Sequence, residues 1–321
     1  MARQHVDHAD IVRFAEDRVN LPRDLANEYR AQARRLREKL ESYLDEHPEF
    51  SLRKMMLSGS LAKGTALRSI NDIDVAVYIS GADTPTDVQS LLRYLAERLK
   101  KAFPNFGPDQ VKPQTYSVTV SFKGTGLDVD VVPILYSGDP EWRGQLVSQD
   151  DGSFLETSIP LHLEFIRRRK TKAEYDYAQV IRLAKYWTKK IKSENANFRF
   201  KSFMVELVFA HLIDTGSRFD DYPEALQQFF TYLASSALRR KIIFTDYYSA
   251  SAVGAFAHPV QLIDPVNAKN NVACLYTATQ ADAIATAALD AGDAIDAALA
   301  APTKAETLYY WQKVFGSTFQ V

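Results

Sequence analysis

The sequence contains very little cysteine, almost no net charge and no long apolar run. Cys274 is the single cysteine among 321 residues, so an intramolecular disulfide and a thiolate metal cluster are both excluded. The formal net charge is -1, which gives no overall attraction to nucleic acid or to an anionic membrane. Any charged partner would therefore have to bind a local patch.

Apolar segments of the length that a leader peptide or a membrane span needs are missing too. The first residues, MARQHVDHADIVRFAEDRV, have no apolar core, and no later segment approaches about 18 consecutive apolar residues. We expect no contact with a membrane and a cytoplasmic location. The sequence is nevertheless 46% hydrophobic, which suffices for the core of one large or two ordinary domains.

The first half of the chain mixes helix and strand patterns. Leu21–His47 predicts one long spine helix, and Leu52–Leu57 predicts a short strand. A Gly-Ser turn, a small helix from Leu61, a strand ending at Ile79 and an amphipathic helix over Thr86–Phe103 follow. The segments TYSVTVSF and LDVDVVPIL, joined by KGTG, predict a hairpin.

The second half is mostly helical. Helices are predicted at about 160–170, 176–193, 201–215, 222–240, 280–300 and 303–315. We therefore expect an α+β fold with a domain boundary near residue 158. Residues 1–158 would form a sheet core with the spine helix, and residues 159–321 would form a helical lobe.

Two aspartates interrupt an apolar strand pattern shortly after the Gly-Ser pair. In NDIDVAVYI, Asp72 and Asp74 share one face of a strand, while Ile73 and Val75 share the other. The two carboxylates would lie roughly 7 Å apart, at about 3.3 Å per residue. Because like charges repel, this pattern indicates a cation between them.

A further acid extends the pair. Asp128 and Asp130 share one face of the strand that closes the hairpin, and Asp130 fits the position of a ligand from a neighbouring strand. Carboxylates about 4 Å apart repel by roughly 4 kcal/mol at an effective dielectric near 20. Two Mg²⁺ or Mn²⁺ ions would relieve this repulsion and bind phosphate as well. The alternative is an ordinary solvated sheet face, which the Gly-Ser pair upstream disfavours.

The Gly-Ser pair predicts an anion site beside the acids. Gly59 and Ser60 lead into a small helix, whose backbone N–H groups would combine with the Ser60 hydroxyl and with Lys63 to hold a triphosphate. Substrate and metal ions would then meet between the turn and the sheet.

At these residues the chain resembles a known superfamily. GSLAKGT, NDIDVAVYI and LDVDVVPIL are similar to the Gly-Ser, Asp-x-Asp and later Asp pattern of the polymerase β-like nucleotidyltransferases. VIRLAKYW and LIDPVNAKNNVA resemble segments of oligoadenylate synthetase and of the cGAS/DncV-like CD-NTases of bacterial anti-phage CBASS signalling. SGSLAKGTALRS, FRFKSFM and YWQKVFGS are most similar to the clade that makes cyclic adenosine trinucleotides alongside HORMA-domain partners.

The resemblance implies a role for each acid. Asp72 and Asp74 would bind both metal ions, and Asp130 would hold the catalytic metal and help to activate the attacking hydroxyl. The choice of Asp130 over Asp128 rests on the resemblance alone. The zinc-ribbon cysteines of the animal DNA sensor are missing, so DNA sensing by that device is not supported.

The resemblance also assigns the phosphate contacts. Ser60 would contact phosphate, and Lys185 and Ser202 match positions that neutralise and anchor the triphosphate of the donor nucleotide. An exposed helix lysine and an ordinary helix N-cap are the simpler interpretations of Lys185 and Ser202. Asn267 and Asn271 are interpreted as part of a loop that closes the lobe.

The implied activity is a cyclic oligonucleotide synthase that uses ATP for anti-phage defence, and the use of other NTPs is left open. A sugar hydroxyl would attack the α-phosphate of an NTP, and pyrophosphate would leave. Two alternatives stay open: transfer of a nucleotide to a protein or RNA acceptor, and a catalytically silent scaffold for a partner protein. A HORMA-domain regulator is an expected partner. Basic runs, such as RRRK at 167–170, are usually solvated helix faces, and DNA binding by two of them is the alternative.

Overall fold

The computed structural model describes residues 5–47, 52–70, 72–81, 84–148 and 152–320. Asn71, the first residue of the NDIDVAVYI segment, lies outside the described residues. The elements follow the chain in this order: α1 (His8–Phe14), η1 (Ala15–Val19), α2 (Arg23–Glu46), β1 (Leu52–Leu57), α3 (Gly59–Lys63), β2 (Asp72–Ile79), α4 (Val88–Ala102), β3 (Val111–Pro113), β4 (Val118–Phe122), β5 (Leu127–Tyr136), β6 (Gly144–Val147), β7 (Phe154–Thr157), α5 (Ile159–Glu194), α6 (Ser202–Asp214), α7 (Tyr222–Ser236), η3 (Ala250–Ala252), α8 (Ala278–Ala300) and α9 (Lys304–Phe315).

The chain divides into two compact units. One comprises Leu21–Glu164 and contains the sheet, and the other comprises Met1–Asn20 together with Phe165–Val321 and is helical. The domain boundary expected near residue 158 stays a prediction. The α+β fold class is confirmed, because the strands gather in the first unit and helices form most of the second.

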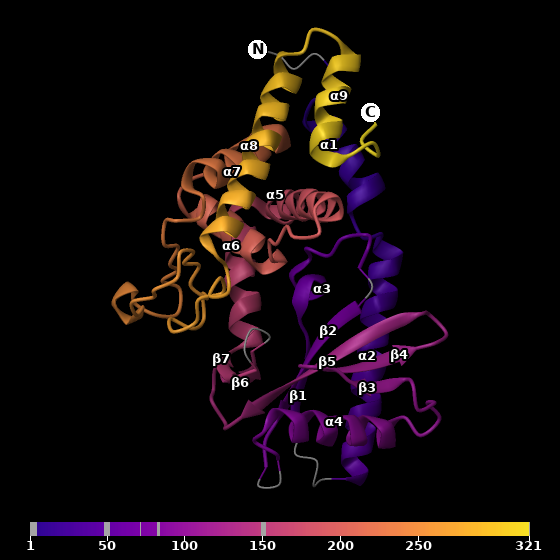
Figure 1. The fold of residues 1–321 in the computed structure, drawn as a ribbon. Helices are drawn as coiled ribbons and strands as arrows, with labels where there is room; N and C mark the ends of the chain where they lie inside the picture. The colour runs from indigo at the N-terminus through magenta and orange to yellow at the C-terminus, as the bar shows by residue number, and fades with distance from the viewer. Residues whose placement is uncertain (1–4, 48–51, 71, 82–83, 149–151, 321) are drawn as a thin grey trace. The chain divides into compact units, whose positions relative to one another are not determined.

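The sheet unit is built around two central strands (Figure 1). The strand order is β1-β2-β5-β4-β3, with β6 paired to β5 and β7 paired to β6. Strands β2 and β5 run parallel, whereas β4 runs antiparallel to β5. The predicted hairpin is therefore confirmed, and its second strand lies directly beside the Asp72–Ile79 strand.

One face of this sheet is apolar and covered by helices. Ile73, Val75, Val77 and Ile79 of β2 are buried there against apolar residues of α2 and α4. At about 25 cal/mol for each Å² removed from water, this burial is the main stabilising contribution to the unit. Because side chains alternate in a strand, Asp72 and Asp74 are placed on the opposite face.

The opposite face is polar at one end and aromatic at the other. Further along β2, Ala76 and Tyr78 are buried on this face, where the Tyr78 ring meets those of Tyr136 and Trp142. The carboxylates are thus confined to the amino-terminal end of β2.

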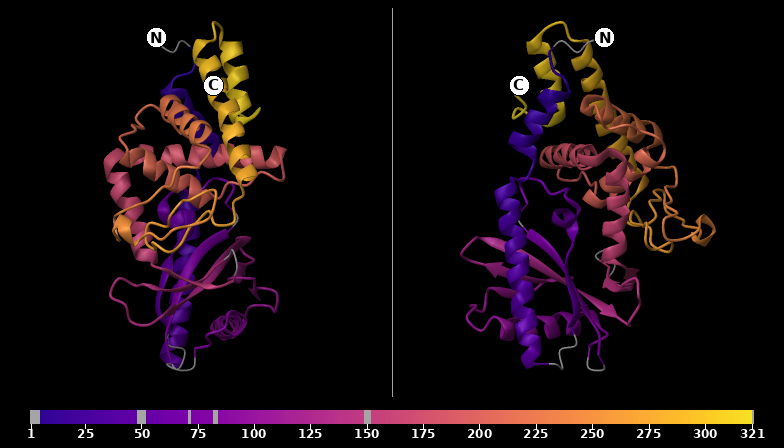
Figure 2. Two further views of the ribbon diagram at one scale, coloured as in Figure 1. Left: turned by 60° about the vertical axis from the view of Figure 1, so that its left-hand side comes forward. Right: turned by 180° about the vertical axis from the view of Figure 1, so that it is seen from behind.

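The helical unit is held together by packing between helices and aromatic rings. α7 packs on α8, and α8 packs on α9 (Figure 2). The N-terminal helix α1 belongs to this unit, since Phe14 packs its ring against Phe315 and Phe319 at centroid distances of 5.1 and 4.8 Å.

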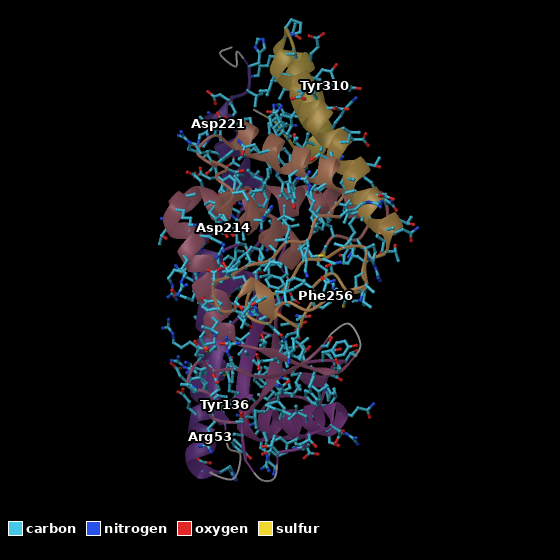
Figure 3. All side chains as sticks on the ribbon, turned by 90° about the vertical axis from the view of Figure 1, so that its left-hand side faces the viewer. Arg53, Tyr136, Asp214, Asp221, Phe256 and Tyr310 are labelled. Atoms are coloured by element: carbon cyan, nitrogen blue, oxygen red, sulfur yellow. The ribbon has the colours of Figure 1, made fainter. Side chains whose placement is uncertain are left out.

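One helix replaces two that were predicted. The expected break between residues 170 and 176 is wrong, because α5 runs without interruption over Ile159–Glu194. The stretch from residue 170 to residue 176 contains no proline or glycine that would end a helix. Its contacts with the rest of the unit include ion pairs, which the apolar pattern does not reveal. Arg169 and Lys172 both pair with Asp214, the last residue of α6, which Figure 3 labels.

The small helix also begins earlier than predicted. α3 starts at Gly59 instead of Leu61, with Ser58 as its N-cap residue, so the Gly-Ser pair is its first two residues. None of the helices in the described ranges is both long and apolar enough to cross a bilayer.

Candidate active site

The parallel pairing of β2 and β5 brings the predicted acids together. Asp72 lies opposite Asp128 in the register, and Asp74 lies opposite Asp130. All four side chains share the polar face, because the intervening residues Ile73 and Val129 are buried on the other face. The structure therefore joins Asp72, Asp74 and Asp130 in one cluster, with Asp128 as its fourth member.

Burial and, after it, electrostatic repulsion within the cluster both act on the carboxyl of Asp72. Loss of part of its hydration raises the pKa of the Asp72 carboxyl above its ordinary value, and the negative charges of Asp130 and, more weakly, Asp128 raise this pKa further. A divalent cation beside Asp72 would oppose the raised pKa by favouring the ionised form.

Thr119 contacts the cluster from the other neighbouring strand. Thr119 pairs with Asp130 across β4 and β5, and its hydroxyl donates a hydrogen bond of 2.6 Å to Oδ1 of Asp130. No motif in the sequence pointed to this residue. The alternation in TYSVTVSF could have placed Thr119 on the polar face, but the register that sets it against Asp130 comes from the structure.

Gly59 fits against Asp74 because it lacks a side chain. Its φ is +61°, and a Cβ atom built there would lie 1.8 Å from Oδ2 of Asp74. The backbone N–H of Ser58 donates a hydrogen bond of 2.8 Å to the carbonyl oxygen of Asp74. The Gly-Ser segment is thus fixed directly beside the second acid. Ser60 and Lys63 follow on the same short helix.

Lys185 and Ser202 lie in the helical unit. Nζ of Lys185 lies 2.5 Å from Oε1 of Glu206, and their side chains are 5% and 2% exposed, so this ion pair is buried. Ser202 is exposed and is the first residue of α6, one turn before Glu206, while Lys201 is the N-cap residue. The predicted phosphate contacts of Lys185 and Ser202 stay predictions.

More positive charge surrounds Glu206. Burial lowers the pKa of Lys170, the nearby cation Arg182 lowers it further, and the negative charge of Glu206 opposes both. Burial likewise lowers the pKa of Arg182, whose Nε donates a 2.8 Å hydrogen bond to Oδ1 of Asn20. The sequence analysis did not identify this grouping of cations, which come from separate turns of α5.

The loop segment DPVNAKNN is built on two buried side chains. Oδ1 of Asp264 accepts hydrogen bonds from the N–H groups of Val266 and Asn267. Oδ1 of Asn271, which is 2% exposed, accepts hydrogen bonds from the N–H groups of Leu262 and Ala273. Asn271 therefore supports the loop from within.

The acid cluster fits a hydrated divalent cation better than a closed metal cage. Across the described ranges, no three His, Cys, Asp or Glu side chains already converge as the ligands of a metal ion. Mg²⁺ is usually bound by one or two carboxylates, with waters and substrate phosphates as the other ligands. The acids that face one another across β2 and β5, and the raised pKa of the Asp72 carboxyl, are compatible with a hydrated Mg²⁺ site.

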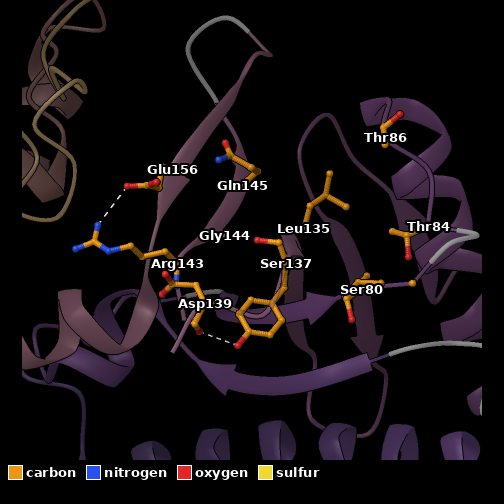
Figure 4. A pocket seen from close by; sticks show the side chains of 13 residues that line it. Ser80, Thr84, Thr86, Leu135, Ser137, Asp139, Arg143, Gly144, Gln145 and Glu156 are labelled. Atoms are coloured by element: carbon orange, nitrogen blue, oxygen red, sulfur yellow. Dashed lines mark hydrogen bonds and ion pairs between the residues drawn. The ribbon is translucent and has the colours of Figure 1, made fainter. Parts of the chain in front are cut away.

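A separate pocket lies at the far ends of the same strands (Figure 4). Its volume is about 320 Å³, and Ile79 and Leu135 contribute to its wall. Arg143 in this wall pairs with Glu156 at 3.2 Å. Seven residues of strand separate Ile79 from Asp72, a distance of about 23 Å, so this pocket is distinct from the acid cluster.

Comparisons with known proteins agree with this geometry. No family model matches the chain. Its fold is that of Vibrio cholerae DncV, a cyclic AMP-GMP synthase, with a TM-score of 0.70 at 12% identity over 98% of this chain and 97% of that one. The chain thus has the DncV-like fold, with its acids on the central strands.

Closer relatives identify the family. The chain is 66% identical to the cyclic AMP-AMP-AMP synthase of Escherichia coli strain MS 115-1 over 320 residues, covering 100% of both chains. It is 32% identical to the CBASS oligonucleotide cyclase CdnC of Escherichia coli strain KTE188, covering 97% of this chain and 96% of that protein. The chain belongs to the CBASS oligonucleotide cyclases.

Two solved structures of the MS115-1 CdnC also match. One holds ATP and has a TM-score of 0.96 at 66% identity, covering 99% of this chain and 100% of that one. The other is a complex of CdnC with HORMA-deltaN and has a TM-score of 0.95 at 65% identity, covering 99% of both chains. The resemblance found in the sequence is confirmed.

Proposed function

We propose that this chain joins ATP into cyclic tri-adenylate, a second messenger of anti-phage defence, with the help of two Mg²⁺ or Mn²⁺ ions. The paired carboxylates of β2 and β5 carry the proposal, in a chain that is similar along its whole length to a cyclic AMP-AMP-AMP synthase. We also propose that it works in the cytoplasm, where its single cysteine stays reduced.

The reaction is transfer of a nucleotidyl group. The oxygen of a sugar hydroxyl forms a bond to the α-phosphorus and its proton passes to water, the bond from that phosphorus to the bridging oxygen breaks, and pyrophosphate leaves with the electron pair. Divalent ions, when bound, lower the pKa of the hydroxyl and neutralise charge on the leaving group. Asp72 and Asp74 would hold both ions, and Asp130 would hold the one beside the attacking hydroxyl.

The remaining site residues would position the triphosphate. Gly59 lets the backbone approach Asp74, while the Ser60 hydroxyl and Lys63 contribute a donor and a positive charge. Lys185 and Ser202 would anchor the phosphate tail of the donor nucleotide. The cations Lys170 and Arg182 support that assignment, since they add positive charge near Glu206, the partner of Lys185.

We propose that a HORMA-domain protein binds this chain, as in the complex solved for CdnC of strain MS115-1. The binding of DNA by basic patches stays a prediction. Because a regulator can control activity without any change at the acids, the assay has to be run both with and without such a partner.

Product analysis tests the proposed function. The protein is incubated with each NTP and Mg²⁺ or Mn²⁺, with and without the HORMA-domain partner, and products are identified by mass spectrometry. We expect cyclic tri-adenylate from ATP and none after Asp130→Asn. Asp128→Asn, the matched control on the same strand, should stay within about tenfold of wild type, because Asp130 is the only one of these two β5 acids that is assigned to a metal ion.

Other products would support the alternatives. If the product is a nucleotidylated protein or RNA and no free oligonucleotide forms, the acceptor is that macromolecule and not a second nucleotide. Full biological activity of a variant with alanine at both Asp72 and Asp74 would indicate a scaffold instead of an enzyme.

A further inference from the structure

One hydrogen bond in the acid cluster connects a proposed metal ligand to a neutral side chain. The Thr119 hydroxyl donates to Oδ1 of Asp130 at 2.6 Å, which is a good distance for a hydrogen bond between two oxygen atoms. The two residues are paired across β4 and β5, so the sheet itself fixes their separation.

The bond restricts a side chain that would otherwise rotate. The terminal torsion of an aspartate is broad, and many orientations of its carboxylate have similar energy. Thr119 is β-branched and its first torsion is stiff, so its hydroxyl is a well-placed donor. With one lone pair of Oδ1 occupied, Asp130 keeps Oδ2 and the other lone pair of Oδ1 for a cation.

From this geometry we propose that Thr119 is a positioning residue, whose hydroxyl orients Asp130 for binding of the catalytic metal ion. The inference rests on the proposed function, since Asp130 is there the ligand of that ion. Partners that orient metal ligands typically change metal affinity or activity by about 10-fold to 100-fold when they are removed.

A purely structural role for Thr119 makes a different prediction. Threonine and valine both favour strands, and valine has nearly the same shape without the hydroxyl. If Thr119 only stabilises the sheet, Thr119→Val should therefore leave metal binding intact. The substitution Ser121→Ala is the matched control, because Ser121 is on the same face of β4, two residues away, opposite Asp128.

The test is direct binding of Mn²⁺ to the full chain, followed by electron paramagnetic resonance in the presence of α,β-methylene-ATP, whose α–β bridge cannot be cleaved. We expect Thr119→Val to weaken Mn²⁺ binding by about 10-fold to 100-fold. Thr119→Ser and Ser121→Ala should stay within about twofold of wild type, because the hydroxyl beside Asp130 is kept in both. Thr119→Ala provides a second variant without the hydroxyl if Thr119→Val does not fold.

The outcomes separate this inference from the proposed function. Mn²⁺ binding by Thr119→Val within twofold of wild type would overturn the inference, as would an equal loss in Ser121→Ala or a failure of Thr119→Ser to retain binding. Asp130→Asn is measured in parallel. If both Asp130→Asn and Thr119→Val bind Mn²⁺ like wild type, the proposed metal site is wrong. If Thr119→Val binds Mn²⁺ like wild type and Asp130→Asn does not, only the proposed role of Thr119 is wrong.

Discussion

Position 59 requires glycine because of its closeness to the acid cluster. Its φ is left-handed, and a Cβ atom added there would lie only 1.8 Å from Oδ2 of Asp74, so there is no room for a side chain. We expect Gly59→Ala to lower product formation by about 100-fold, since displacement of a reacting group by about 1 Å has that effect. The strained backbone should also cost about 1–2 kcal/mol of unfolding free energy.

The control for Gly59→Ala is Gly124→Ala in the hairpin turn, where a Cβ atom would have nothing within 4 Å. That variant should keep wild-type activity and melting temperature. Equal activity of Gly59→Ala and Gly124→Ala would show that the close approach to Asp74 is unimportant.

Asp72 gives a prediction about pH. Its pKa is raised in the folded chain by lost hydration and by repulsion from Asp130 and Asp128, so the folded state binds its proton more tightly than the unfolded state does. Stability contributed by this proton is present at low pH and lost as pH rises through the folded pKa. In metal-free buffer, Asp72→Asn should therefore raise the melting temperature at pH 7.

The gain from Asp72→Asn should shrink as the pH falls below the pKa of the carboxyl, because wild type is then protonated as well. Calorimetric melting in EDTA across this range is the measurement. With Mg²⁺ and ATP present the order should reverse, since wild type alone keeps the full set of ligands. A lower melting temperature for Asp72→Asn in EDTA at pH 7 would contradict the account.

At the scale of single residues, the acids were predictable and their neighbours were not. Period-two alternation sufficed to place Asp72 and Asp74 on one face. The contact of Thr119 with Asp130 depends on strand order and register, which arise from the packing of the whole sheet. Local pattern carries no information on which residue lies opposite another.

At the scale of elements, α5 and α6 are joined by the buried pair of Lys185 and Glu206. Removing one partner from a buried ion pair leaves an uncompensated charge, so Lys185→Met should cost about 3–5 kcal/mol of unfolding free energy. The double variant Lys185→Met/Glu206→Leu should recover most of that loss. Urea denaturation measures both effects.

Lys185→Met and the double variant also separate the effect of Lys185 on unfolding free energy from its effect on ATP binding. If Lys185 contacts the triphosphate, the double variant Lys185→Met/Glu206→Leu should be nearly as stable as wild type but should bind ATP more weakly than wild type does. Arg239→Met is the control, because Arg239 pairs with Asp282 at the surface, with both side chains more than half exposed, and should cost less than about 1 kcal/mol. A Lys185→Met variant as stable as wild type would refute the importance of the buried pair.

Elements were predicted well where apolar periodicity was continuous. The strand Leu52–Leu57 has its predicted bounds, and the spine helix differs by a residue or two at each end. The prediction failed within α5, where periodicity lapses over residues that pair with acids of other helices, such as Lys172 with Asp214. An exposed polar stretch of this kind shows no apolar periodicity, and only the lack of proline and glycine indicated that the helix continues.

At the scale of the whole molecule, the helix α1 completes the core of the helical unit. Phe14 is 2% exposed and packs on Phe315 and Phe319 from the other end of the chain. Phe14→Ala should cost about 3–5 kcal/mol by cavity formation. Tyr309→Ala is the control, because Tyr309 is 57% exposed, and chemical denaturation should separate the two variants clearly.

Contacts between the two ends of the chain could not be predicted from local patterns. HADIVRF is too short to form a stable helix by itself, and its position depends on α9 and on the loop after it. Equal stability of Phe14→Ala and Tyr309→Ala would show that this terminal segment contributes nothing to the unit.

In the proposed mechanism, Asp72, Asp74 and Asp130 together bind the divalent ions that act on ATP. The most direct measurement is a crystal structure of the chain grown with Mn²⁺ and α,β-methylene-ATP, with manganese located by its anomalous scattering. We predict anomalous peaks in contact with all three carboxylates and with the nucleotide phosphates. Nucleotide bound with manganese on other residues, or with Asp130 outside the coordination shell, would contradict the account.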